Sequence, residues 1–455
     1  MKRLVVLDVV GLTPRALAHA PRLAALAKGG FRATLEPVFP AVTCPAQATM
    51  FTGLLPREHG VVGNGWYFGD LAEVLFWRQS SRLVSGRTVW ETARARDAKF
   101  TCAHLFWWYA MYSSADVVLT PRPAYPADGR KLPDLWSHPP ELRAEIQKEL
   151  GTFPLFEFWG PRAGIASTRW IAEASRRVIE RTRPTLALVY LPHLDYDFQR
   201  FGPDDPRSLA AVREIDSVAG DLADAVRADG AEVIVLSEYG ITGVDGDVAL
   251  NRALRRAGLL RVLDQVGFEL LDAGASRAFA VADHQAAHVY VAHERDLDAA
   301  REAIAAEPGV DHVLDKEDQR ALGIDHPRSG DLVAIAKPDK WFSYYYWLDE
   351  EKAPDFAPTV DIHRKPGYDP AELFLDPKIP LVKARILWKL ARKKLGFRTL
   401  LDVIPTNGAL VRGSHGRLPD APGDGPLLLS TSPVGAREKL HQSEVADLLL
   451  ETIFR

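Results

Sequence analysis

Residues 3–10 read Arg-Leu-Val-Val-Leu-Asp-Val-Val, a short apolar run that meets a single carboxylate at Asp8. An apolar run without alternation is typical of a strand buried on both faces of a sheet. Three more runs share this character, and each follows a helical or polar stretch: Leu186–Leu191, Glu232–Leu236 and Leu332–Ala336. Apolar strands that alternate with helices predict the α/β class, with a mostly parallel central sheet and helices on both of its faces.

Polar residues follow three of these runs directly. They are Asp8 after the first run, Pro192–Asp195 after the second and Ser237–Gly240 after the third. In a parallel α/β sheet the active residues lie at the carboxyl ends of the strands. Each of these polar residues is therefore a candidate for a functional site.

The length and composition are those of an ordinary globular protein. The chain has 455 residues, of which 47% are hydrophobic and 25% are charged, and its net charge is -4. These values exclude wholesale disorder, collagen-like repeats and a coiled coil, and they give no reason to expect binding to a nucleic acid polymer. We expect a single α/β domain over residues 1–455, with cap or insert segments at about 107–160 and 337–398 that are rich in aromatic residues and proline.

The cysteine count and the apolar runs bear on the compartment. Two cysteines, Cys44 and Cys102, are too few for a disulfide framework and fit a reducing environment. The N-terminal apolar run contains a carboxylate, unlike a secretory signal. No uncharged apolar run reaches the roughly 18 residues of a membrane span. We therefore expect a cytoplasmic protein.

The most informative segment is Phe39–Gly53, which reads FPAVTCPAQATMFTG. Thr43, Cys44 and Pro45 form a good helix start, because threonine caps helices and proline fits the first turn. The free N–H groups at such a start would stabilise a phosphate or a developing alkoxide at the Thr43 hydroxyl. A plain capping threonine explains the same residues. Cys44 is a rival nucleophile, but a buried, inert thiol explains it better because no histidine follows it in the local pattern.

Three features follow one another along the chain: Asp8 at a strand end, Thr43 at a helix start, and the stretch Leu54–Gly65 (LLPREHGVVGNG). This order resembles the type I phosphodiesterase / nucleotide pyrophosphatase branch of the alkaline phosphatase superfamily. The resemblance implies an alkaline phosphatase-like fold. It also implies that Thr43 is the nucleophile and a metal ligand, that Asp8 is a metal ligand and that Asn64 holds a phosphoryl oxygen. Metal coordination would lower the pKa of the threonine hydroxyl and supply the alkoxide.

The later blocks of the sequence keep the family's order but change several ligand types. The resemblance places Asp195 at an aspartate ligand, with Gln199 where the family has histidine. It places Glu238 and Tyr239 at an aspartate–histidine pair of ligands. His415 matches the family's late histidine ligand.

Further residues could complete the ligand set. His363 stands just before a Gly-Tyr-Asp-Pro stretch and is a rival or an addition to the late histidine, whereas His284 is a weaker candidate. On an extended strand end, residues two apart point the same way, so His193 and Asp197 could face the same site as Asp195. For each extra histidine, a hydrogen-bonded or surface position is the commoner explanation.

The resemblance implies one or two divalent metal ions, with zinc as the family's metal. Gln199 and Tyr239 are poor zinc ligands, because zinc prefers cysteine, histidine and carboxylate. A carboxylate-rich set with one histidine suits manganese or magnesium, and a tyrosinate ligand would suggest iron.

Aromatic residues near the expected site have two explanations. The resemblance implies that Trp107 and Tyr190 stack on the leaving part of a diester, where stacking contributes about 1–3 kcal/mol. A nucleobase or an apolar aglycone would both suit such rings. Packing in the core is the commoner use of these side chains.

These observations favour a metal-dependent phosphohydrolase that cleaves a phosphodiester or pyrophosphate bond of a small-molecule phosphate ester through a covalent Thr43 intermediate. A phosphomonoesterase or phosphonate hydrolase of the same superfamily is the alternative, because fold does not fix function. The changes at Gln199 and Tyr239 also leave open a degenerate, non-catalytic member that binds a phosphorylated ligand.

Residues 378–398 carry eight basic side chains and no acid, with apolar residues interleaved. This pattern predicts a basic amphipathic helix. Such a helix can make a peripheral contact with an anionic membrane. A solvated helix that packs its apolar face on the protein is the commoner case.

Overall fold

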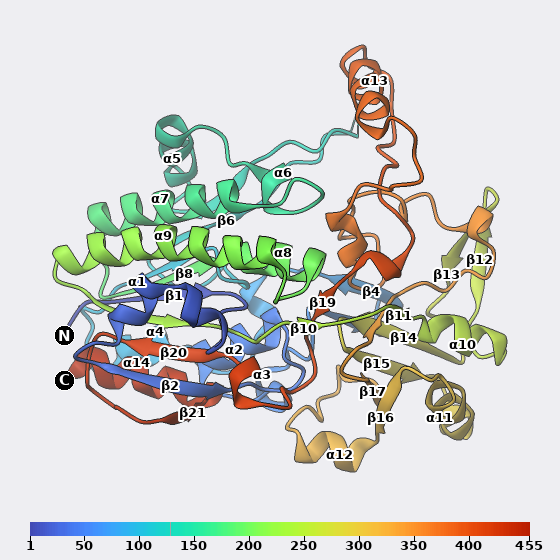
Figure 1. The fold of residues 1–455 in the computed structure, drawn as a ribbon. Helices are drawn as coiled ribbons and strands as arrows, with labels where there is room; N and C mark the ends of the chain where they lie inside the picture. Colours follow the sequence, from blue (N-terminus) through green and yellow to red (C-terminus); the bar gives the residue numbers. More distant parts are fainter. Residues whose placement is uncertain (128) are drawn as a thin grey trace.

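The computed structural model describes residues 1–127 and 129–455, and a nine-stranded sheet runs through the larger part of the molecule (Figure 1). Its neighbouring strands β9, β1, β8, β5 and β6 are mutually parallel. Their bounds are β1 Leu4–Val9, β5 Cys102–Leu105, β6 Val117–Pro121, β8 Leu186–Leu191 and β9 Glu232–Leu236. Every residue of β1 and β8 is buried, Asp8 included, as in strands that are covered on both faces of a sheet.

The edges of this sheet mix strand directions. Strand β7 (Leu135–His138) is antiparallel to β6, and β20 (Leu427–Ser430) is antiparallel to β9. Strand β2 (Phe31–Glu36) pairs antiparallel with β20 and parallel with β21 (Lys439–His441). The expected mostly parallel sheet is confirmed, and residues 107–160 supply strands β6 and β7 to one of its edges.

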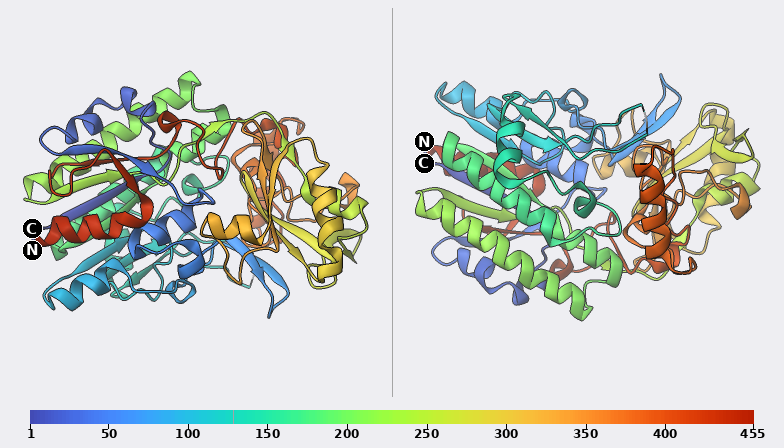
Figure 2. Two further views of the ribbon diagram at one scale, coloured as in Figure 1. Left: turned by 90° about the horizontal axis from the view of Figure 1, so that it is seen from below. Right: turned by 90° about the horizontal axis from the view of Figure 1, so that it is seen from above.

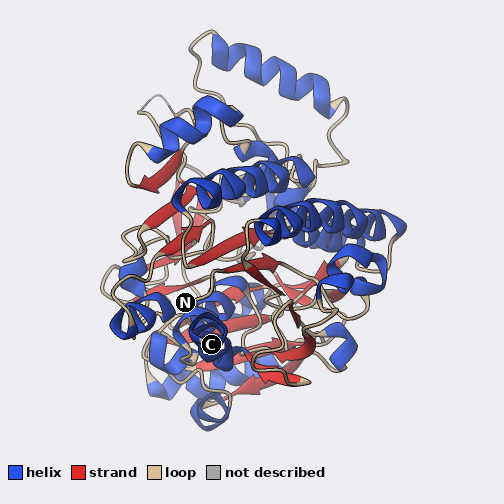
Figure 3. Cartoon of the chain, turned by 90° about the vertical axis from the view of Figure 1, so that its left-hand side faces the viewer, coloured by secondary structure: helices blue, strands red, loops and turns tan. Residues whose placement is uncertain are grey.

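Helices cover both faces of the large sheet (Figures 1 and 3). One face carries α1 (Pro21–Leu26), α7 (Ile165–Thr182) and α9 (Pro206–Ala228); the other carries α2 (Thr43–Thr52), α4 (Val89–Arg96) and α14 (Val445–Phe454). The sequence of α9 explains its position. Its buried residues Ala211, Ile215, Ala219, Leu222 and Val226 recur every three or four positions, which places them on one stripe of the helix.

A second, four-stranded antiparallel sheet has its own hydrophobic core and stands beside the large one (Figure 2). Its strands in spatial order are β14 (Ala278–Asp283), β15 (Ala286–Val291), β17 (Leu332–Ala336) and β16 (Val310–Leu314). The prediction for Leu332–Ala336 is right in its bounds and wrong in its place, because this strand pairs antiparallel with β15 and β16 outside the central sheet. An apolar run indicates that a strand is buried, but it does not indicate which sheet the strand joins.

Shorter elements complete the two units. The helices are α3 (Pro56–His59), α5 (Leu142–Leu150), α6 (Leu155–Phe158), α8 (His193–Phe201), α10 (Leu250–Arg256), α11 (Leu297–Ala305) and α12 (Lys316–Ala321). The strands are β3 (Gly65–Phe68), β4 (Glu73–Phe76), β10 (Thr242–Gly243), β11 (Asp247–Val248), β12 (Val262–Gln265), β13 (Phe268–Leu271), β18 (Trp341–Phe342) and β19 (Gly413–Ser414). Across the described residues, no helix combines the length and the apolar content needed to cross a bilayer.

Residues 337–398 begin inside the second core and end outside it. Tyr344, Tyr346 and Trp347 are fully buried in that core, so the aromatic stretch serves packing. The chain then forms α13 (Val382–Lys394), which projects from the body of the molecule at the top of Figure 1.

Candidate active site

Two carboxylates meet at the carboxyl ends of neighbouring parallel strands. Asp8 lies in β1, and Glu238 follows the end of β9. The side-chain amide of Gln47, on α2, donates to both, with Nε2 3.2 Å from Asp8 Oδ2 and 2.5 Å from Glu238 Oε1. The backbone N–H of Trp108 donates to Gln47 Oε1 at 2.7 Å, which fixes the NH₂ group on the carboxylate side.

Thr43 is the first residue of α2 and is buried beside this pair. Its hydroxyl lies 3.1 Å from the hydroxyl of Tyr239. Val42 holds the N-cap position, so Thr43 does not act as the cap and the plain capping explanation is wrong. The neighbouring Cys44 is buried, and burial raises the pKa of its thiol well above the usual value, which disfavours the thiolate that a nucleophile needs.

Asp195 lies in the first turn of α8 and is held by two neutral donors. Gln199, one helical turn later, donates from Nε2 to Asp195 Oδ2 at 2.9 Å, and the Tyr239 hydroxyl donates to Asp195 Oδ1 at 3.3 Å. The hydroxyl of Tyr368 in turn donates to Gln199 Oε1 at 2.9 Å. Asp195 therefore connects to Thr43 through Tyr239.

The expectation of an extended strand end around Asp195 is wrong. The chain turns into α8 at His193, and in a helix residues four apart share a face whereas residues two apart do not. His193 consequently bonds Glu214 at 3.0 Å, and Asp197 pairs with Arg200 at 2.8 Å.

A stack of four rings closes one side of the site. Tyr239 and His415 stack with centroids 3.6 Å apart, His415 and His284 lie 3.8 Å apart, and His284 and Tyr368 lie 3.6 Å apart. Burial, together with the neighbouring His284, lowers the pKa of His415 well below the usual value, so this ring is neutral. Its Nδ1 lies 2.8 Å from the carbonyl oxygen of Ala41 and must donate to it, which leaves an unprotonated Nε2 facing Asp195 Oδ1 at 3.8 Å.

Asn64 links the two sheets. Its backbone N–H donates to Asp283 Oδ2 at 2.7 Å, and its Nδ2 donates to Asp283 Oδ1 at 3.1 Å. Its Oδ1 accepts the backbone N–H of Cys44 at 2.9 Å, so Asn64 sits against the start of α2. Asp283 ends β14, and His284 follows it with a φ of 63°, a strained conformation for a non-glycine residue.

Most of the predicted site residues converge here: Asp8, Thr43, Asn64, Asp195, Glu238, Tyr239 and His415. Tyr190 lies opposite Asp8 on the neighbouring strand and is buried near the carboxylates. Trp107 packs in the large core.

His363 does not join this cluster, and the expectation that it supplements the late histidine is wrong. Its ring lies 6.4 Å from that of Tyr125, outside the site. The stretch that follows it carries Tyr368 into the site instead.

Sequence reasoning missed Gln47, Asp283 and Tyr368. Gln47 lies one helical turn after Thr43, so its spacing could have pointed to it. Tyr368 stands in the Gly-Tyr-Asp-Pro stretch that resembles the family. Asp283 reaches the site from the second sheet and carries no local signal.

Three buried carboxylates share this site without a basic partner. Burial raises the pKa of Asp8 well above its usual value, and the adjacent Glu238 raises it further. Burial raises the pKa of Glu238 to about 7, and burial together with the charge of Glu238 raises the pKa of Asp195 to about 7. In the described part of the chain, no lysine or arginine forms an ion pair with these three groups. Such a cluster calls for a cation or for bound protons.

The donor set fits one hard divalent ion and does not fit a pair of zinc ions. Asp8 Oδ1 and Glu238 Oε2 are buried without a hydrogen-bond partner, and with the Thr43 hydroxyl they offer the oxygen ligands that magnesium or manganese takes. Over residues 1–127 and 129–455, no group of three or more histidine, cysteine, aspartate or glutamate side chains is arranged as a metal site, so Thr43 would have to complete this set.

The hydrogen bonds to Asp195 come from neutral donors. Both oxygens of Asp195 already accept hydrogen bonds from Gln199 and Tyr239, whereas the unprotonated Nε2 of His415, 3.8 Å from Asp195 Oδ1, is buried without a hydrogen-bond partner. Burial and the charge of Asp195 raise the pKa of Tyr239 well above its usual value, which disfavours the tyrosinate that iron would prefer.

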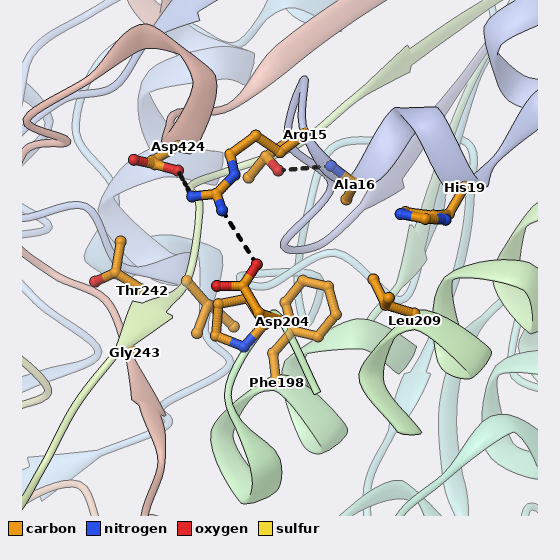
Figure 4. Close-up of a pocket in the computed structure, with 12 residues that line it drawn as sticks. Arg15, Ala16, His19, Phe198, Asp204, Leu209, Thr242, Gly243 and Asp424 are labelled. Atoms are coloured by element: carbon orange, nitrogen blue, oxygen red, sulfur yellow. Dashed lines mark hydrogen bonds and ion pairs between the residues drawn. The ribbon is translucent and has the colours of Figure 1, made fainter. Parts of the chain in front are cut away.

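A surface pocket of about 350 Å³ lies against α8 and contains none of these residues (Figure 4). Phe198 and the loop after β1 line it. Arg15 within it pairs with Asp204 at 3.1 Å and with Asp424 at 2.8 Å, so its charge is already balanced. The cluster around Thr43 therefore remains the candidate active site.

Curated relatives are similar to about half of this chain. An uncharacterized pyrophosphatase/phosphodiesterase of Schizosaccharomyces pombe is 24% identical over 217 residues, which are 46% of this chain and 37% of that protein. Ectonucleotide pyrophosphatase/phosphodiesterase family member 1 of Mus musculus is 22% identical over 221 residues, which are 47% of this chain and 20% of that protein. The chain thus matches well under two thirds of the length of either relative.

Solved structures with a similar fold cover nearly the whole chain. An inactive variant of murine ectonucleotide pyrophosphatase / phosphodiesterase 5 in complex with AMP superposes with a TM-score of 0.62 at 16% identity, over 100% of this chain and 95% of that one. Phosphonoacetate hydrolase of Sinorhizobium meliloti in complex with phosphonoformate gives a TM-score of 0.61 at 14% identity, over 99% and 96%. At these identities the likeness shows the fold alone, which is the expected alkaline phosphatase-like one. Over residues 4–369 the sequence also matches a family described as type I phosphodiesterase / nucleotide pyrophosphatase, and the chain therefore belongs to that family.

Proposed function

We propose that this chain is a hydrolase that cleaves a phosphodiester or pyrophosphate bond through a covalent Thr43 intermediate. The observation that carries the proposal is the buried Thr43 hydroxyl, at the start of α2, beside the Asp8–Glu238 pair and 3.1 Å from the Tyr239 hydroxyl. The start of a helix favours the negative charge that develops there. Family membership and the name of the fission yeast relative support the same reaction class.

In this proposal the hydroxyl of Tyr239 joins Thr43 to a base. Tyr239 donates to Asp195 Oδ1 at 3.3 Å, so its oxygen can accept the Thr43 proton at 3.1 Å. Proton transfer from Thr43 through Tyr239 to Asp195 generates the nucleophile. A pKa of about 7 suits Asp195 to accept that proton near neutral pH. The Thr43 oxygen then bonds to phosphorus while the bond from phosphorus to the leaving alcohol or phosphate breaks, and that group departs with the bonding electron pair. Water later displaces Thr43 from phosphorus, and the proton held by Asp195 returns through Tyr239 to the threonine oxygen.

We further propose that Asp8, Glu238 and Thr43 hold a single magnesium or manganese ion. When bound, the ion would supply Lewis-acid stabilisation of charge on the phosphoryl oxygens and lower the pKa of the threonine hydroxyl. The family depends in general on divalent metal ions, which supports this part of the proposal. The zinc pair that the resemblance implies is not proposed, because Gln199 and Tyr239 satisfy Asp195 by hydrogen bonding.

The proposed substrate is a small-molecule phosphate ester with a planar or apolar leaving group. Trp77 and Trp108 are half-buried, with ring centroids 4.8 Å apart, and Trp77 lies 6.0 Å from the ring of Tyr368. Tyr368 in turn stacks on His284 in the site. Rings grouped in this way can stack on a nucleobase. The AMP complex of the murine structure with a similar fold supports this choice.

A phosphonate hydrolase is the second candidate, because phosphonoacetate hydrolase shares the fold over nearly the whole chain. A substrate panel separates the two. The purified chain, supplied with magnesium or manganese, is assayed on bis(p-nitrophenyl) phosphate, p-nitrophenyl phosphate, ADP-ribose and phosphonoacetate. We expect the highest kcat/KM on the diester or the pyrophosphate. Preference for phosphonoacetate would overturn it, and turnover of none would assign the chain to the non-catalytic, ligand-binding members.

A further inference from the structure

Helix α13 (Val382–Lys394) projects from the body of the molecule at the top of Figure 1, and it again stands outermost at the top of Figure 3. None of its residues is buried. The segment 378–398 around it carries eight basic residues and no acid. A solvated helix alone would not require so many apolar side chains.

Two opposite faces of α13 are apolar, and the protein covers only one. Val382 and Ile386 pack against the small core formed by Ala371, Val403 and Ile404. At about 100° per residue, the opposite side of the helix carries Ala384, Leu387, Trp388 and Ala391. Leu387 is 69% exposed and Trp388 is 64% exposed. The prediction that the apolar face packs on the protein is therefore confirmed for the inner stripe, Val382 and Ile386, but not for the outer stripe that carries Leu387 and Trp388.

Basic side chains flank the exposed stripe on both sides. The same helical spacing puts Lys383 and Lys394 along one border and Arg385 and Arg392 along the other. Arg385 pairs with Asp402 at 2.7 Å. Among the described residues, no carboxylate forms an ion pair with Lys383, Arg392 or Lys394, so their charges remain available to an external partner.

We propose that the outer face of α13 docks this protein on an anionic lipid bilayer. An apolar stripe with an exposed tryptophan, bordered by cations, fits a helix that lies in the plane of the headgroup region. The charge of such a surface complements the uncompensated basic residues. Contact is peripheral, because the apolar stripe covers one side of a 13-residue helix. This proposal concerns a surface separate from the Thr43 cluster and does not depend on the proposed hydrolase activity.

The test is co-sedimentation of the full chain with lipid vesicles. Wild type is expected to bind vesicles of equal parts phosphatidylcholine and phosphatidylglycerol, to bind phosphatidylcholine alone far more weakly, and to be released by high salt. The double variant Leu387→Ser/Trp388→Ser is expected to lower the partition coefficient by at least about tenfold. The double variant Lys383→Gln/Lys394→Gln is expected to lower it by about fivefold per charge removed.

The hairpin of β12 and β13 offers a matched control. Leu263 is 54% exposed and Phe268 is 40% exposed, and acids rather than bases accompany them in this hairpin. Leu263→Ser/Phe268→Ser removes two exposed apolar side chains and is expected to bind vesicles as wild type does. Circular dichroism of each variant confirms that its helix content is retained.

Several outcomes would overturn the proposal. The first is that wild type does not bind anionic vesicles. The second is that the Leu387→Ser/Trp388→Ser variant binds them as well as wild type does. The third is that the hairpin control loses as much binding as the Leu387→Ser/Trp388→Ser variant. Sedimentation velocity adds a further outcome. A dimer that this variant dissociates, without any vesicle binding, would assign the outer face to a second copy of the chain.

Discussion

The hydroxyl oxygens of Thr43 and Tyr239 lie 3.1 Å apart in the interior of the protein. The family pattern has a histidine ligand at the position of Tyr239, so in this chain a hydroxyl group stands where a metal ligand is expected. A phenol can accept a proton on one side and donate one on the other. Thr43 is thereby joined to Asp195 without an intervening ion.

Replacement of Thr43 by alanine should abolish the covalent intermediate. We expect Thr43→Ala to lower kcat by at least about a thousandfold, because the nucleophile is lost. Acid quenching during turnover, followed by mass spectrometry, should find the phosphoryl or nucleotidyl adduct on wild type and on the control Thr43→Ser, but not on Thr43→Ala. An adduct on another residue, or full activity of the alanine variant, would exclude the Thr43 mechanism.

Removal of the Tyr239 hydroxyl should break the proton path. We expect Tyr239→Phe to lower kcat by about a hundredfold. The rise of kcat with pH near 7, which follows ionisation of Asp195, should disappear with it. Tyr346→Phe is the matched control, because it removes a buried hydroxyl in the second core. A pH–rate profile that Tyr239→Phe leaves unchanged would show that the proton takes another route.

Metal content should be one equivalent per chain. Elemental analysis after loading with manganese, and isothermal titration calorimetry, measure it without reference to activity. Asp8→Asn should weaken binding by at least about tenfold, because it removes a carboxylate ligand. Asp195→Asn should leave the stoichiometry unchanged. Two equivalents that fall to one in Asp195→Asn would restore the two-ion site of the family.

The metal-free protein should lose stability as the pH rises toward 8. Folding raises the carboxyl pKa values of Glu238 and Asp195 to about 7 from 4.5 and 3.8, so the folded state retains protons that the unfolded chain releases. This contribution is complete below about pH 4 and is lost as the pH rises through about 7. Urea titrations in the presence of a chelator should show a falling free energy of unfolding between pH 5 and 8, with a shallower fall in Asp195→Asn. A rise over this interval would contradict the assignment.

The central fold and one side of the site could be predicted from the sequence. Apolar runs without alternation identify β1, β8 and β9, and the carboxyl ends of parallel strands lie at one edge of the sheet, so Asp8 and Glu238 converge. Thr43 could be placed because a proline in the first turn marks the start of its helix.

The remaining features depend on contacts distant in sequence. Asp283 belongs to the second sheet, and its carboxylate meets Asn64 across 219 positions of sequence. Hydrophobic periodicity predicts whether a residue is buried, but it does not predict which residue, distant in sequence, the buried side chain contacts.

Asn64 lies two residues after Val62 of the large core, and two hydrogen bonds tie it to Asp283, the last residue of β14. If the Asn64 amide turns to a phosphoryl oxygen, as the family resemblance implies, it gives up a bond that joins the two sheets. We therefore expect substrate analogues to speed hydrogen exchange in β14 and β15, and unchanged exchange would show that the amide stays with Asp283. Ligand binding at the site and separation of the two sheets are then linked equilibria, and a change in either one shifts the other.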